Sequence, residues 1–109
     1  MDRLVEERDL DATRFRCCGD EDLYPFGCPD CDRLMVFCYE CGTLYGDLTD
    51  LSNQDTSINH FNPAVPKFHC PGCRKPFGYF FMRDRQYRVT MARWVGAGFG
   101  HLLDSGAGT

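Results

Sequence analysis

The chain has 109 residues, of which 43% are hydrophobic, and it carries a net charge of −4. This length allows one domain, or one small domain with tails, and a core of that size usually needs a disulfide or a metal for stability. The longest apolar stretch, residues 91–103, falls short of the ~20 residues that a membrane-spanning helix requires, so we expect no membrane association.

The predicted elements are short, and polar loops separate them. In chain order they are an arm or short helix over 1–16, a loop over 17–31, a buried strand at 34–37, a return strand at 42–45, a long polar loop over 46–63, a hairpin with strands at 65–69 and 77–81, a turn at 83–86, a strand at 87–91, a helix over 92–103 and a flexible tail over 105–109. Three glycines disfavour the last helix.

The charge is unevenly distributed along the chain. Residues 1–55 contain 5 basic and 14 acidic side chains, a balance of −9, whereas residues 56–109 contain 7 basic and 2 acidic ones, a balance of +5. Such asymmetry can mark a charged partner surface. The alternative is that the two halves fold together and partly neutralise each other.

Three copies of one short pattern supply six of the eight cysteines. We call them the first turn (Cys28–Cys31), the middle turn (Cys38–Cys41) and the last turn (Cys70–Cys73). Each turn offers two thiolates to a metal ion, and two turns complete a four-cysteine shell. The charged N-terminus has no apolar signal segment, so we expect a cytoplasmic, reducing setting in which a metal rather than disulfides stabilises the fold.

The turns and their flanking aromatic residues resemble the zinc-ribbon superfamily, in which two hairpin tips clamp one zinc ion. The resemblance covers residues 26–82 and concerns a fold class rather than one protein family. It implies a small metal-stabilised β-rich or α+β domain over residues 17–91, built from two or three hairpins and holding one or two zinc ions. Residues 92–104 would cap this domain. Iron in a rubredoxin-like site is the alternative metal.

The sequence leaves two pairings of the turns open. In one, the middle turn joins the last turn, and the first turn forms a second site with Cys17 and Cys18. In the other, the first turn joins the last turn, and the middle turn lies roughly 20 Å away at the far end of the strand. We favour the former, because each site then closes with shorter loops. His60, His69 or His101 could replace a missing thiolate.

The ligand set indicates a structural rather than a catalytic metal. A catalytic zinc ion keeps an open position, usually near a general base, and the sequence contains no H-x-E or H-E-x2-H arrangement. We therefore expect no catalytic residues and a non-enzymatic module that mediates protein–protein interaction, as a regulator, an adaptor or an immunity-type protein. Acidic residues such as Asp22, Asp47 and Asp50 would meet a basic partner.

Two other functions stay open. Nucleic-acid binding would use the basic segment 67–93, in which cations alternate with aromatic residues. Its candidate contacts are Lys67, Arg74, Lys75, Arg83, Arg85, Arg88 and Arg93. A thiol redox sensor would instead use Cys17 and Cys18, which follow Arg14 and Arg16.

Overall fold

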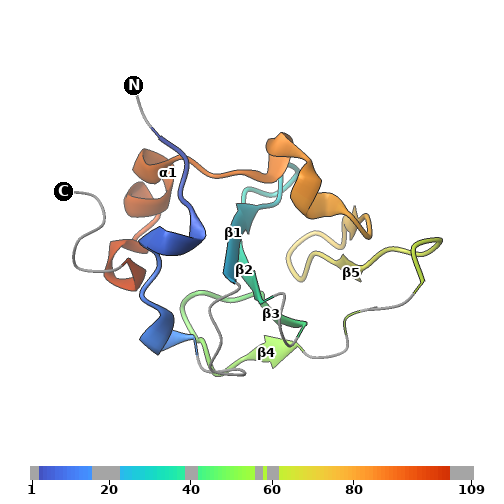
Figure 1. Ribbon diagram of the computed structural model, residues 1–109, viewed down its shortest axis with the longest axis horizontal. Coiled ribbons are helices and arrows are strands. Elements are labelled where there is room, and N and C mark those ends of the chain that lie inside the picture. The colour runs from blue at the N-terminus through green and yellow to red at the C-terminus, as the bar shows by residue number, and fades with distance from the viewer. Residues whose placement is uncertain (1–2, 16–22, 39–41, 56–57, 59–61, 104–109) are drawn as a thin grey trace.

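The computed structural model describes residues 3–15, 23–38, 42–55, 58 and 62–103 (Figure 1). Its centre is an antiparallel sheet whose four strands lie in chain order: β1 (Leu23–Gly27), β2 (Leu34–Cys38), β3 (Thr43–Tyr45) and β4 (Gln54–Asp55). A second, two-stranded sheet pairs β5 (Phe68–His69) with β6 (Pro76–Phe77). The protein is therefore a small β-rich α+β structure with little helix.

Helical segments are short and flank the sheets. The 3-10 turns are η1 (Glu7–Asp9), η2 (Ala12–Arg14), η3 (Phe81–Arg83), η4 (Arg85–Tyr87) and η5 (Gly100–Leu102), and the α-helix is α1 (Met91–Gly96). Thr90 caps α1 by accepting a hydrogen bond from the Arg93 N–H, which satisfies one of the free donors of the first turn. No helix among the described residues is long and apolar enough to cross a membrane.

The four-stranded sheet is covered on both faces, because successive side chains of a strand point to opposite sides. Leu34, Val36 and Cys38 of β2 lie in one apolar cluster, whereas Met35 and Phe37 lie in another. All five are buried, so the strand reads as a continuous hydrophobic run rather than as an alternating one. The register of this strand decides which residues can approach each cluster.

One cluster, which we call the terminal core, is built from both ends of the chain. Val5, Phe15, Trp94 and Leu102 pack there against one face of the sheet. The N-terminal and C-terminal segments lie together on one side of the molecule, opposite β5 (Figure 1), and isolated bridges join Leu4 to Thr90 and Leu10 to Leu103. Neither terminal segment has a complete apolar face of its own, so each depends on the other for burial.

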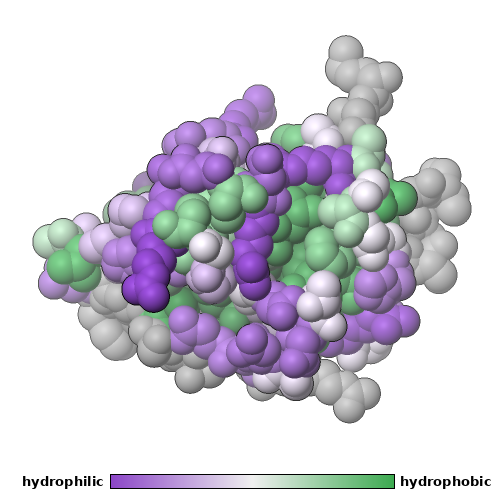
Figure 2. All heavy atoms as spheres, turned by 180° about the vertical axis from the view of Figure 1, so that it is seen from behind, coloured by the Kyte–Doolittle hydropathy of each residue, from purple (hydrophilic) through white to green (hydrophobic). Residues whose placement is uncertain are grey.

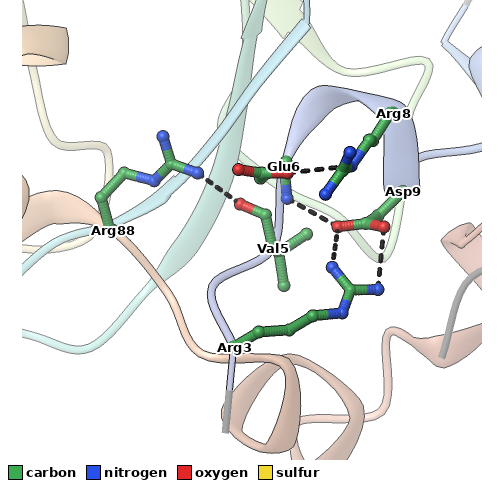
Figure 3. A network of polar contacts seen from close by, with 6 residues as sticks. All are labelled: Arg3, Val5, Glu6, Arg8, Asp9 and Arg88. Atoms are coloured by element: carbon green, nitrogen blue, oxygen red, sulfur yellow. Dashed lines mark hydrogen bonds and ion pairs between the residues drawn. The ribbon is translucent and has the colours of Figure 1, made fainter.

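Polar contacts fasten the N-terminal arm (Figure 3). The Arg3 guanidinium donates two hydrogen bonds to the buried Asp9 carboxylate, at 2.6 and 2.9 Å. The bond from Arg3 is the largest influence on Asp9 and holds the pKa of this carboxyl below its ordinary value. Arg88, from the other end of the chain, donates to the Val5 carbonyl oxygen at 2.7 Å.

The second cluster, which we call the aromatic core, joins the two sheets. Phe26 and Phe37 of the large sheet pack there against Phe68, Phe77 and Phe81. The Phe68 and Phe77 rings are stacked with centroids 4.8 Å apart, and the Phe26 and Phe81 centroids are 4.9 Å apart. Packing in the aromatic core stabilises β5 and β6, which are too short to be stable alone.

The predicted strands at 34–37 and 42–45 are confirmed by β2 and β3. The predicted loop over 17–31 is wrong in its second half, because 23–27 form β1; its first half lies mostly outside the described residues. The prediction took Pro25 as a loop residue, but β1 is an edge strand of the sheet, where proline is tolerated. The predicted helix over 92–103 is present only as α1 and η5, separated by a left-handed glycine, Gly98.

Three further boundaries differ from the prediction. The loop over 46–63 contains the two-residue strand β4, and the outgoing strand of the last hairpin ends at Phe77 rather than at 81. The predicted strand at 87–91 is wrong, because η4 ends at Tyr87 and a single bridge at Thr90 precedes α1. Tertiary packing of the aromatic side chains overrides their strand propensity in this segment.

Candidate metal centre

Four cysteine sulfurs meet between the two sheets. The Sγ atoms of Cys28, Cys31, Cys70 and Cys73 all lie within 4.8 Å of one another. Cys28 and Cys73 are 3.5 Å apart and Cys31 and Cys70 are 3.6 Å apart. A disulfide would need about 2.05 Å, whereas a tetrahedral ion with 2.3 Å metal–sulfur bonds separates its sulfurs by about 3.8 Å. The donor set therefore suits one tetrahedrally coordinated metal ion.

Two hairpin tips with the same backbone shape supply these thiols. The first turn joins β1 to β2, and the last turn joins β5 to β6. The Asp32 N–H donates to the Cys28 carbonyl oxygen at 2.9 Å, and the Arg74 N–H donates to the Cys70 carbonyl oxygen at 2.8 Å. Asp32 and Arg74 are both left-handed, with φ of 62° and 65°. This closure brings the two cysteines of each turn to one side.

The middle turn closes in the same way, but its Cys38 does not belong to this group of four thiols. Its Gly42 N–H donates to the Cys38 carbonyl oxygen at 2.9 Å, and Gly42 has φ of 71°. Cys38 belongs to the terminal core, whereas Cys28 belongs to the aromatic core on the other face of the sheet. The pairing that we favoured, between the middle and last turns, is therefore wrong. Loop entropy rises slowly with length, and the burial of five aromatic rings between the first and last turns outweighs it.

Of the remaining candidate ligands, the structure describes only His69 and His101 besides Cys38. Cys17, Cys18, Cys41 and His60 lie outside the described residues. His69 and His101 are exposed, and neither belongs to the group of four thiols. Within the described ranges, this group is the one arrangement of three or more potential ligands.

The thiols sit in a setting that disfavours free thiolates. Burial raises the pKa of Cys28 to about 12 and also raises the pKa of Cys31. At Cys70 burial again raises the pKa, but backbone N–H groups of Cys73 and Gly72 and the neighbouring thiols outweigh it, so the pKa lies below its ordinary value. The Gly72 N–H points at the Cys70 sulfur at 3.4 Å. A bound cation would compensate the charge of four deprotonated sulfurs, of which those of Cys28 and Cys70 belong to buried residues.

Glycines permit the close approach of the two sheets at this point. A Cβ atom on Gly72 would lie 3.2 Å from the Cys31 sulfur and 3.3 Å from Arg33 Cδ. A Cβ atom on Gly46, just after β3, would lie 2.8 Å from Pro71 Cγ, closer than real Cβ contacts allow. The last turn therefore packs against both the first turn and the end of β3.

Charges from the two halves of the chain meet around the centre. Asp32 in the first turn pairs with Arg93 at 3.2 Å, and Asp30 lies 3.8 Å from the Lys75 ammonium. The alternative that the halves partly neutralise each other is confirmed. Asp47 and Asp50, predicted to meet a basic partner, use their carboxylates to accept hydrogen bonds within their own turns. Asp22 lies outside the described residues.

The predicted nucleic-acid contacts separate into two groups. Arg88, Arg93 and Lys75 take part in the contacts already given, and the buried Lys67 lies between the Phe37 and Tyr79 rings, where burial lowers its pKa. The other three are exposed, and no carboxylate of the described residues lies within ion-pair distance of them: Arg74, Arg83 and Arg85.

Sequence reasoning missed one exposed aromatic residue. Among the aromatic residues of the basic segment, Phe77, Phe81 and Tyr87 are buried in the aromatic core, whereas Phe80 is 50% exposed. Phe80 lies in the turn after β6, where the alternation of a strand does not apply, so no signal in the sequence indicated its exposure.

Comparison with protein-family models, with curated proteins and with solved structures found no match to this chain. Assignment of a function therefore rests on the geometry of the cysteine centre and of the surfaces around it.

Proposed function

We propose that the protein is a zinc-stabilised, non-enzymatic binding module of zinc-ribbon type. The observation that carries the proposal is the closed set of four thiols from two hairpin tips. Four protein ligands fill the tetrahedral shell of zinc and leave no position for water or substrate, which is the pattern of structural zinc sites. When bound, zinc supplies a cross-link between the two sheets and no reaction chemistry.

We extend the proposal to a second zinc ion, at the middle turn. Its closure at Gly42 repeats that of the first and last turns. Cys38 pairs with Leu23 across β1 and β2, and Cys17 and Cys18 precede Leu23 by only six and five residues in the sequence. With Cys41 they complete a second set of four thiols. Three of these cysteines lie outside the described residues, so chain distance alone supports their part.

The metal proposal is tested by native mass spectrometry of protein from its own host, purified without added reductant. Two zinc ions and no disulfide are expected. The Cys73→Ser variant should lose one ion and the Cys38→Ser variant the other. Red protein containing iron would refute the choice of metal, and a single ion lost in both variants would refute the two-site arrangement.

The binding partner that we propose is another protein, docked on the face that carries α1. Seen from behind, this part of the molecule shows hydrophobic side chains at the surface, bordered by hydrophilic ones (right in Figure 2). Val95 of α1 is a large apolar side chain, yet it is 50% exposed rather than buried in the core. Exposed apolar groups with a polar border are typical of protein-interaction surfaces. We also propose a reducing compartment such as the cytoplasm, because a four-cysteine metal site needs reduced thiols.

The protein-binding role is tested with two matched variants. Val95→Arg and Val65→Arg make the same change at residues that are 50% and 45% exposed, on α1 and on the loop before β5. A stoichiometric partner that co-purifies with the wild type should be lost in Val95→Arg and kept in Val65→Arg. If no stoichiometric partner co-purifies, the role is refuted; if both variants keep it, the α1 face is the wrong surface.

A further inference from the structure

Four side chains near β5 and β6 form a continuous ladder of cations and aromatic rings. The Lys67 ammonium lies 4.7 Å from the Tyr79 ring centroid, and the Tyr79 and Phe80 centroids are 4.9 Å apart with an interplanar angle of 79°. The Arg83 guanidinium carbon lies 4.6 Å from the Phe80 centroid. Three separate segments contribute: the residue before β5, the turn after β6, and η3.

The outer end of this ladder is not part of the core. Phe80 is 50% exposed, whereas its neighbours in sequence Phe77 and Phe81 are 0% and 3% exposed. Arg83 is exposed, and its guanidinium group lies over the Phe80 ring. Packing therefore explains Phe77 and Phe81, but it does not explain a half-exposed phenylalanine beside an arginine.

Two further arginines, Arg74 and Arg85, belong to the same basic segment of the sequence as the ladder. Arg74 and Arg85 are exposed, and like Arg83 they lie beyond 4.0 Å from every described carboxylate. Asp84, which lies between two of these arginines in the sequence, accepts hydrogen bonds from the backbone and the side chain of Gln86 instead. The surface therefore offers several guanidinium groups to an anion.

From this geometry we propose that the Phe80–Arg83 ladder, with Arg74 and Arg85, is a binding surface for single-stranded nucleic acid. Unstacked bases lie flat on aromatic rings and on guanidinium planes, and phosphates accept hydrogen bonds from the edges of the three arginines. A duplex keeps its base faces stacked internally and offers only phosphates. An acidic protein segment would satisfy the charges but would have no use for the planar groups.

The inference is independent of the protein-binding role of the α1 face, because it uses the opposite end of the molecule (Figure 1). Its test is fluorescence anisotropy with the metal-loaded full chain and a labelled single-stranded RNA of about 12 nucleotides, within the usual site sizes. Saturable binding is expected, with a log–log salt slope of about −2 for three phosphate contacts. The same-sequence duplex and a poly-glutamate peptide of equal charge should compete poorly.

Matched variants locate the surface. Arg83→Gln should weaken binding and reduce the salt slope by about 0.7, whereas Arg8→Gln makes the same charge change at an exposed residue of the N-terminal arm and should leave both unchanged. Phe80→Ala should weaken binding about fivefold or more, and Val65→Ala should not. Arg83→Lys keeps the charge and should lose affinity without changing the slope.

Folding defects are controlled by the metal content and melting midpoint of each variant, and Phe80→Leu serves if Phe80→Ala is unstable. Three results would overturn the inference. They are unsaturable or absent binding at low salt, competition by the duplex or the acidic peptide as strong as that by unlabelled single strand, and equal losses in Arg8→Gln and Arg83→Gln.

Discussion

The four-thiol centre predicts that Cys31→Ser and Cys73→Ser behave as one mutation. Their sulfurs belong to one cluster, although they come from different turns and different sheets. Both cysteines are exposed, so serine removes little apolar burial at either position. Any large loss of stability must therefore come from loss of the metal.

The expected magnitude follows from the size of the small sheet. Strands β5 and β6 have two residues each and are held by the aromatic core and the last turn. Structural zinc contributes an apparent ~10–16 kcal/mol in small domains, against a typical net stability of about 5–15 kcal/mol. Loss of one ligand should therefore unfold at least the segment 67–87. The double variant should be no less stable than either single variant, because the metal is lost only once.

The assay combines metal analysis, urea unfolding and amide hydrogen exchange. Each single variant should bind one metal ion fewer than the wild type and lose amide protection around Phe68 and Phe77. Ala64→Ser is the matched control, since it places serine at an exposed position before the same hairpin. Additive stability losses in the double variant, or a cooperative wild-type melt that a strong chelator leaves unchanged, would refute the reasoning.

Three further predictions concern the N-terminal arm, the terminal core and the close contact at Gly46. Asp9→Asn should lower the free energy of unfolding by about 1–2 kcal/mol at pH 7, because it weakens the hydrogen bonds from Arg3. The pKa of Asp9 is lowered in the folded state. Urea unfolding should therefore show the full difference above the unfolded pKa of about 3.9, and the difference should vanish as the pH falls through the lower folded pKa. Trp94→Ala removes a side chain that is 0% exposed and should destabilise by about 3–5 kcal/mol in the same assay, with Trp94→Phe costing less. Gly46→Ala should lower the free energy of unfolding by about 1–3 kcal/mol through overpacking. Gly96→Ala is the control, because the new Cβ would meet no neighbouring atom within 4 Å, and it should be neutral or slightly stabilising. An equal effect of the two variants would contradict the close contact at Gly46.

The sequence alone was sufficient for the chemistry of the centre and for part of the fold. Paired cysteines two residues apart are a local pattern, and local backbone closure presents both sulfurs to one side. The strands at 34–37 and 42–45 were predictable for the same reason, since the middle turn joins two apolar runs. The seven cations of the basic segment were also visible, but not that Arg74, Arg83 and Arg85 would have no carboxylate partner among the described residues.

Only the tertiary structure decided which turns bring their thiols together. Cys38 and Met35 differ by three positions on one strand, so the period-two alternation places them on opposite faces of the sheet. The local sequence of either turn does not predict which face of the large sheet the hairpin of Phe68 and Phe77 will cover. That choice depends on the packing of aromatic rings from segments about forty residues apart, and it overrode the small entropic preference for shorter loops on which the sequence-based pairing relied.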